Sequence, residues 1–322
     1  MEVFTHAGLQ MLILFTLVAL GFVARKRHMM NDDFDSQVTS VVMNIALPGM
    51  IIDSVLSNQN LPDTSTILML LLYSFLIYVG ICIFALIITR VLYWRVPKAT
   101  KGAFEFLICF GNVGFIGFPV LSAIVGPDAV LYAAILNIPY NLFMFSVGVL
   151  FIKNAGQSDA PAAEHSLKTQ VKLILKQMVN PCMISCIVAV ILAILRVTDD
   201  GYFGQTFGLI GQFTVPAAML LTGSQLAKMP LKEMFNDPWS WVTTALRLFV
   251  VPLLVFFIAG MFVHDSYMLS ILALQAAMPA ASLGIMMSIA YGGDTMAMSR
   301  GTFLTTVCAL ISLPVVSMIV VV

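Results

Sequence analysis

Charged side chains are scarce in this chain of 322 residues, where Asp, Glu, Lys and Arg together make up only 10%. Soluble domains contain about 25%. Histidine occurs four times, always at the end of an apolar run or between two runs. An intramembrane metalloenzyme needs ligands clustered within helices, so this distribution argues against one. The chain also lacks a glycine–lysine phosphate-binding loop and any basic block with interleaved aromatic residues. We therefore expect no enzyme activity, no cofactor or metal, and no nucleic-acid partner.

Apolar residues account for 60% of the chain, and they gather in runs of about 20 residues. Such runs are typical of a polytopic, all-α membrane protein. The N-terminus has no basic region and its apolar run continues to about Ala24, so we interpret it as a retained span. The five cysteines lie within the runs and are interpreted as packed thiols. Numbered 1 to 10, the predicted spans are 4–24, 36–57, 65–94, 102–125, 128–152, 173–195, 205–227, 239–263, 266–290 and 300–321.

A polar linker, 153–172, divides the ten spans into five and five. The first half is then 1–152 and the second 173–322. Of the 16 Lys and Arg residues, all but Arg196 fall on one side of the membrane, which the positive-inside rule makes cytoplasmic. We therefore expect both termini to lie outside the cytoplasm, in a protein of the cell (inner) membrane.

An odd number of spans in each half inverts the second half relative to the first. Prolines recur at corresponding places in three pairs of spans: Pro48 and Pro216 in spans 2 and 7, Pro119 and Pro279 in spans 4 and 9, and Pro139 and Pro314 in spans 5 and 10. This pattern predicts two inverted five-helix repeats, which is a common architecture of secondary transporters.

Span 4 contains residues that weaken a helix interior: Gly111, Gly114, Gly117 and Pro119, together with Asn112. Each glycine costs a helix about 1 kcal/mol relative to alanine, and an interior proline costs about 3 kcal/mol. In lipid, a broken helix persists only where protein or a water-filled cavity satisfies its backbone. We therefore expect spans 4 and 9 to be broken and to cross at the midplane, where transporters bind their substrates. A proline kink with close-packing glycines is the other interpretation.

These residues carry a family resemblance that covers nearly the whole chain. The segment from Asn112 to Pro119 resembles the Asn-x-x-x-x-Gly-x-Pro motif in the fourth span of the auxin efflux carrier family. That family includes the plant PIN auxin carriers and bacterial permeases for malate and malonate. Leu47-Pro48, Pro279 and Leu313-Pro314 also fit its pattern. The plant carriers have proline before the crossover asparagine, where this chain has Gly111, and their large cytoplasmic loop is absent here.

The resemblance implies a transporter of small organic anions, such as malate, malonate or a monocarboxylate. It also implies an elevator-like movement of spans 3–5 and 8–10 against a scaffold of spans 1, 2, 6 and 7. A homodimer through spans 2 and 7 is expected on the same grounds. The direction of transport and the choice of proton, sodium or no coupling ion stay open.

Asn112 is the first candidate for contact with the substrate, because an amide offers two donors and one acceptor to a carboxylate. In the other interpretation of Asn112, its side chain only satisfies backbone groups freed by the helix break. Half-helix N-termini of spans 4 and 9 supply a positive dipole end at the same point. Further candidates for the substrate site are Gly111, Val113, Gly114, Pro279, Ala280 and Ser282. Gly117, Pro119 and Pro279 are expected at the helix breaks, with Pro279 in the first turn of the second half-helix.

Buried amides give a second set of candidates. Asn137 and Asn141 lie four residues apart in span 5 and face one direction, either as a clamp between helices or as the wall of a polar path. The same two interpretations apply to Gln275.

Three ionisable residues within the spans are candidates for proton or charge coupling. Asp53 is a possible proton site or a hydrated carboxylate near the outer mouth. Glu105 is expected near the cytoplasmic interface, within reach of Lys101 or Arg247. Arg247 either draws anions toward the inner mouth or extends to the interface.

Two alternative functions remain: one differs from the anion transporter in its coupling ion, and the other is a receptor rather than a transporter. A sodium-coupled carrier of the bile-acid-symporter type resembles this architecture, but it needs acidic and amide ligands for sodium that spans 4 and 9 lack at mid-span. A membrane receptor that binds an anion without moving it needs an appended signalling domain, and none follows span 10.

Overall fold

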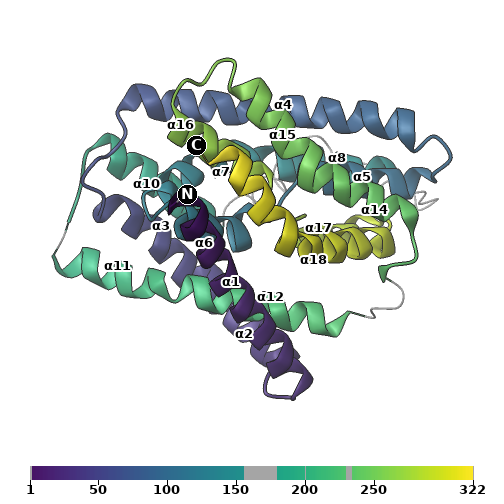
Figure 1. The fold of residues 1–322 in the computed structure, drawn as a ribbon, viewed down its shortest axis with the longest axis horizontal. Helices are drawn as coiled ribbons and strands as arrows, with labels where there is room; N and C mark the ends of the chain where they lie inside the picture. Colours follow the sequence, from purple (N-terminus) through teal and green to yellow (C-terminus); the bar gives the residue numbers. More distant parts are fainter. Residues whose placement is uncertain (1, 156–179, 200, 230–233, 322) are drawn as a thin grey trace, which may run out of the picture.

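The computed structural model describes residues 2–155, 180–199, 201–229 and 234–321 (Figure 1). This part of the chain is helical throughout, with about 81% helix and no strand. Six helical stretches are long and apolar enough to cross a membrane, and shorter apolar helices accompany them. The protein is therefore a multi-pass helical membrane protein, and the number of ten crossings stays a prediction. Most of the linker predicted over 153–172 lies outside the described residues.

Helical segments occur in every predicted span. In the first half they are α1 Glu2–Lys26, α2 Asp32–Val41, η1 Val42–Ala46, α3 Leu47–Leu56, α4 Thr64–Leu92, α5 Lys98–Cys109, η2 Val113–Gly117, α6 Phe118–Ile124, α7 Ala129–Phe143, η3 Met144–Gly148 and α8 Val149–Ala155. In the second half they are α10 Pro181–Ile194, α11 Tyr202–Gln212, α12 Thr214–Lys228, α14 Pro238–Ala245, η4 Leu246–Val250, α15 Val251–Ala259, α16 Ser266–Ala276, α17 Leu283–Tyr291 and α18 Thr295–Val320.

Four π-helical turns, η1 to η4, interrupt the helices, and three of them accompany a proline. Pro48, Pro119 and Pro252 each occupy the second residue after a π turn. Proline has no N–H and its ring clashes with the carbonyl four residues earlier. That carbonyl lies inside the π turn in all three cases, so the wider turn lets the helix continue past the proline. The predictions that Gly117 and Pro119 mark a helix break are therefore wrong, because both lie in the continuous stretch of η2 and α6.

The true breaks lie in two short segments that pair with one another. Helix α5 ends at Cys109 and the chain is helical again from Val113, whereas α16 ends at Ala276 and α17 begins at Leu283. Between them, Gly111 and Ala280 form an antiparallel bridge. We call residues 110–112 and 277–282 the crossover. Its backbone groups bond to one another and to the side chains of Tyr140, Arg247 and Thr305, because lipid offers them no partner.

Two backbone hydrogen bonds close the crossover. The Asn112 N–H donates to the Pro279 carbonyl at 2.6 Å, and the Ala281 N–H donates to the Phe110 carbonyl at 2.9 Å. Pro279 thus lies in the extended part of the crossover, several residues before α17. The expectation that it opens the second half-helix is wrong, because its carbonyl is needed for the pairing and the helix starts only at Leu283.

Around the crossover, helices pack in two neighbourhoods (Figure 1). Helix α1 lies along α12, and α3 lies against α10 and α11, whereas α5 packs against α4, α8 and α18. The α1–α12 pair is unusually close at two glycines. A Cβ at Gly21 would lie 2.0 Å from the Leu220 carbonyl oxygen, and one at Gly223 would lie 1.9 Å from that of Val18. Close backbone approach of this kind is how helices associate in lipid.

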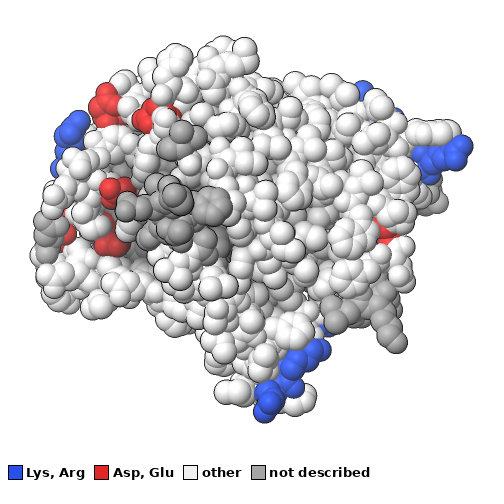
Figure 2. Space-filling view, in the orientation of Figure 1, with Lys and Arg blue, Asp and Glu red and all other residues white. Residues whose placement is uncertain are grey.

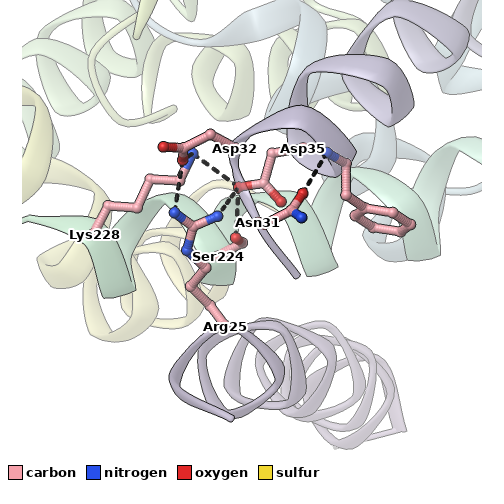
Figure 3. A network of polar contacts seen from close by, with 7 residues as sticks. Arg25, Asn31, Asp32, Asp35, Ser224 and Lys228 are labelled. Carbon is pink, nitrogen blue, oxygen red and sulfur yellow. Dashed lines mark hydrogen bonds and ion pairs between the residues drawn. The ribbon is translucent and has the colours of Figure 1, made fainter. Parts of the chain in front are cut away.

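Charged side chains gather toward the ends of the face shown in Figure 2 and leave a broad uncharged middle. One charged cluster joins α1, α2 and α12 (Figure 3). Asp35 of this cluster is only 4% exposed. It accepts a hydrogen bond from Ser224 at 2.6 Å and forms an ion pair with Lys228 at 2.9 Å. Arg25 pairs with Asp32 at 2.6 Å. The cluster fixes the adjoining ends of three helices to one another.

Candidate functional site at the helix crossover

Asn112 stands at the end of the first crossover segment and does two things. Its Oδ1 accepts the Phe115 N–H at 3.1 Å, so it caps the π turn that follows. Its Nδ2 has no hydrogen-bond partner among the described residues. Because Asn112 also lines a cavity, the amide donors remain available to a ligand while the carbonyl holds the backbone. The two interpretations of Asn112 are therefore compatible.

The cavity beside Asn112 spans about 300 Å³ of space between protein atoms, which includes open solvent, and its enclosed part has room for about one water molecule. Ser282, which precedes α17, also lines it, and its hydroxyl has no partner in the described part of the chain. Thr302 of α18 is 2% exposed and its Oγ1 is buried without a partner. The remaining lining comes from η2, α12 and α18: Ile116, Thr222, Gln225, Leu226, Met229, Phe303 and Thr306. None of these side chains is charged.

A second cavity, of about 350 Å³, adjoins the first and shares Ile116, Thr222 and Thr306 with it. Pro279 lines this second cavity, together with apolar side chains of α1, α6, α12 and α18. The space next to the crossover therefore has a polar part rich in hydrogen-bond donors and an apolar part. We call these the polar cavity and the apolar cavity.

Arg247 lies behind the crossover and is only 1% exposed. Its Nε donates to the Met278 carbonyl at 2.9 Å, and its Nη1 donates to the carbonyls of Ile108 at 3.0 Å and Cys109 at 3.3 Å. Both predicted positions for Arg247, the inner mouth and the interface, are wrong. Its side chain turns inward because three carbonyls at the ends of the first half-helices would otherwise be unsatisfied in an apolar interior.

Gly111 is held between two side chains. Tyr140 donates its hydroxyl to the Gly111 carbonyl at 2.6 Å. On the other side, a Cβ at position 111 would lie 2.0 Å from Nη2 of Arg247. Space, rather than backbone conformation, therefore requires glycine here.

The other crossover candidates have packing roles. Ala280 is fully buried, and its N–H donates to Thr305 Oγ1 at 3.1 Å. Val113 is also buried, and a Cβ at Gly117 would make ordinary contact with Met278. Gly114 differs, because nothing lies within 4 Å of the Cβ it would carry.

The amides of span 5 face α10 and not the crossover cavities. Asn137 Nδ2 lies 3.7 Å from Cys186 Sγ and 3.9 Å from Cys182 Sγ. Asn141 donates to the Asn137 carbonyl at 2.8 Å and approaches Met183 Sδ. Of the two interpretations, the contacts fit a clamp between helices. Gln275 is buried against α4 and α7 in a separate small cavity, where its Oε1 has no partner.

The two acidic candidates lie apart from the polar cavity. Glu105 accepts a hydrogen bond from Thr89 of α4 at 2.8 Å. Its predicted ion partners, Lys101 and Arg247, form no ion pair with it in the described part of the chain. Asp53, near the end of α3, is partly buried beside Gly208 of α11. The structure thus brings together Asn112, Ser282 and Pro279 but neither acid.

Several residues of the site carry no signal in the sequence. Thr302, Thr222 and Gln225 are ordinary polar residues within apolar helices, and only the fold shows that they line one cavity. Asp35 is another residue that sequence reasoning missed, although an acid early in an apolar run, with cations near two neighbouring span ends, was a usable signal.

Residues 6–317 match the family model for membrane transport proteins, which covers nearly the whole chain. The chain belongs to the auxin efflux carrier family. An uncharacterized transporter of Methanothermobacter thermautotrophicus is 23% identical over 308 residues, which is 94% of this chain and 95% of that protein. The uncharacterized transporter YfdV of Escherichia coli K12 is 24% identical over 283 residues, 86% of each chain. This auxin efflux carrier family member is thus a membrane transporter, as the broken helices predict.

Proposed function

We propose that this transporter carries small organic anions and binds their carboxylate in the polar cavity. The observation that supports this most is a pair of donors in a cavity without acidic side chains: Thr302 Oγ1, which is buried, and Asn112 Nδ2, which is partly buried, neither with a partner among the described residues. Buried polar groups normally have partners, and a carboxylate accepts several hydrogen bonds at once. The Ser282 hydroxyl, also without a partner among the described residues, adds a third donor.

The adjoining apolar cavity supports a substrate with an apolar body. No Lys or Arg lines either cavity, so a second carboxylate, as in malate or malonate, would lack a counter-charge. An apolar group in the second cavity would instead gain about 25 cal/mol for each Å² removed from water. Within mono- and dicarboxylates, we therefore favour monocarboxylates.

The proposed mechanism is alternating access between two parts of an inverted five-plus-five repeat. Ten crossings, termini outside the cytoplasm, and a scaffold of spans 1, 2, 6 and 7 belong to this proposal. It is supported by the close α1–α12 pair on one side of the cavities and by the crossover with α18 on the other. A homodimer through spans 2 and 7 and coupling to protons, with Asp53 as the titrating group, complete it.

Uptake into proteoliposomes tests the function. Phenylacetate, octanoate, malate and malonate, each radiolabelled, would be compared for wild type and Asn112→Asp. Aspartate keeps an oxygen to cap Phe115 N–H but replaces the amide donor by a negative charge, so binding fails while the crossover stays folded. Gly114→Ala, in the same motif but in open space, is the matched control and should transport normally.

The outcomes separate the hypotheses. Uptake of an acid that is lost in Asn112→Asp and kept in Gly114→Ala supports the crossover site. Normal uptake by Asn112→Asp contradicts it. Binding without uptake supports the receptor alternative, and dependence on a sodium rather than a pH gradient supports the sodium-coupled alternative.

A further inference from the structure

A crossover of two broken helices brings four helix ends together. The ends of α5 and α16 present carbonyls and a negative dipole end, whereas the starts of η2 and α17 present N–H groups and a positive one. With equal numbers of each, the fields of the four ends nearly cancel at the centre. A bare crossover therefore attracts neither anions nor cations strongly.

Arg247 removes this balance. All three of its hydrogen bonds to described residues go to carbonyls at the ends of the first half-helices, those of Ile108, Cys109 and Met278. The four ion pairs of the described residues involve only Arg25, Lys228, Asp32 and Asp35, so no described acid neutralises Arg247. Its positive charge covers the negative ends and leaves the positive ends uncovered.

We propose that Arg247 is the specificity-determining residue that makes the crossover selective for anions, acting through the electrostatic potential from behind the binding site. The deduction rests on the proposed function for the identity of the ligand, but the potential itself is independent of any ligand. The guanidinium lies against Gly111, the residue before Asn112, so its charge is close to the polar cavity without lining it. The permanent positive charge of Arg247 also disfavours the binding of a sodium ion at the crossover.

A cysteine reporter measures this potential directly. Ser282→Cys places a thiol on the polar cavity with little change in volume, in a background where Cys308, the partly exposed native thiol, is replaced by serine. The rate of modification is measured with two methanethiosulfonate reagents of similar size, one bearing a sulfonate and one a trimethylammonium group. The ratio of the two rates, anionic over cationic, reports the sign of the potential.

Arg247→Met and Arg247→Lys are compared in this reporter background. A unit charge at a separation on the order of 10 Å changes each of the two rates by roughly tenfold, in opposite directions, at an effective dielectric constant of about 20. We therefore expect the ratio to fall by about a hundredfold in Arg247→Met. The lysine variant keeps the charge and should keep most of the ratio. An equal ratio in all three proteins overturns the inference.

Two further measurements test the inference if the first variant fails. If Arg247→Met does not fold, Arg247→Gln, which keeps amide donors for the carbonyls but loses the charge, is measured in its place; a ratio equal to that of wild type overturns the inference. Binding of phenylacetate and of the neutral phenylacetamide then gives a second test. Loss of Arg247 should weaken the acid alone, whereas a merely structural role would weaken both equally. Absence of acid binding in wild type contradicts the proposed function, while the thiol measurement still tests the potential.

Discussion

Substitution of Gly111 by alanine tests the tightest contact in the crossover. The new Cβ would lie 2.0 Å from Arg247 Nη2 and 3.1 Å from the Met278 carbonyl oxygen. Neither neighbour has room to move freely, because the guanidinium is held by three carbonyls and Met278 is part of the paired backbone. The protein must therefore either strain the crossover or move Arg247.

The cost follows from these two routes. Overpacking a filled site costs about 1–3 kcal/mol, and hydrogen bonds to a charged group are worth about 1.5–3 kcal/mol each. Reduced freedom of the unfolded chain returns about 0.4–1 kcal/mol. We expect a net loss of about 2–3 kcal/mol for Gly111→Ala. Gly114→Ala should be neutral or slightly stabilising, since its Cβ enters open space.

A double-mutant cycle assigns the loss to Arg247. Thermal unfolding in detergent would be followed for wild type, Gly111→Ala, Arg247→Lys and the double variant. Lysine has no Nη2, so the alanine should cost about 2 kcal/mol less in its presence, a coupling typical of contacting residues. The steric explanation is refuted if Gly111→Ala and Gly114→Ala melt at the same temperature. It is also refuted if Gly111→Ala lowers the free energy of unfolding by the same amount in the Arg247→Lys background as in wild type.

Three further substitutions test other contacts. Asp35→Asn should lower the free energy of unfolding by about 1.5–3 kcal/mol, the value of a hydrogen bond to a charged group, because it removes the charge of the buried carboxylate while Asp32 still pairs with Arg25 and Lys228; the exposed Asp33→Asn is the control, and equal melting temperatures of the two variants would contradict this. Asn137→Leu should leave uptake unchanged, because its amide faces the Cys182 and Cys186 sulfurs; a loss of transport by folded protein would place it in the path instead. Asp63, which caps α4, has its pKa lowered from 3.8 to about 2 by hydrogen bonds from Ser65 and Thr66. The ionised Asp63 therefore stabilises the fold above about pH 4, and this stabilisation is lost as the pH falls toward 2. The melting temperature of Asp63→Asn should depend less on pH in that range than that of wild type. The same pH dependence in both proteins would count against the cap.

The sequence predicts the crossover better than its details. Glycines around Asn112, and Pro279 in span 9, mark helices that cannot remain intact in lipid, and both break. Pro119 misleads because a π turn absorbs a proline as well as a break does, and no residue pattern distinguishes the two. Pro279 misleads because proline suits both a first helical turn and an extended segment without an N–H to satisfy.

Long-range contacts explain the remaining differences. In the sequence, Arg247 is a cation near the end of a span. Its contacts are with backbone carbonyls of residues that lie 31 and 139 positions away. Backbone carbonyls leave no trace in side-chain patterns, so this role is invisible before the fold is known. Thr302 is likewise a common residue whose place in the cavity shows only in the fold, whereas Ser282 is a candidate in the sequence because it follows Pro279 in span 9.

The most direct measurement of the central claim is a structure of the protein with the acid that it transports best. We expect the carboxylate oxygens within hydrogen-bond distance of Asn112 Nδ2 and Thr302 Oγ1, with the apolar body in the cavity lined by Pro279. An acid bound elsewhere, for example in the separate cavity lined by Arg95, Asp237 and Asp294, with the polar cavity empty, would contradict the account.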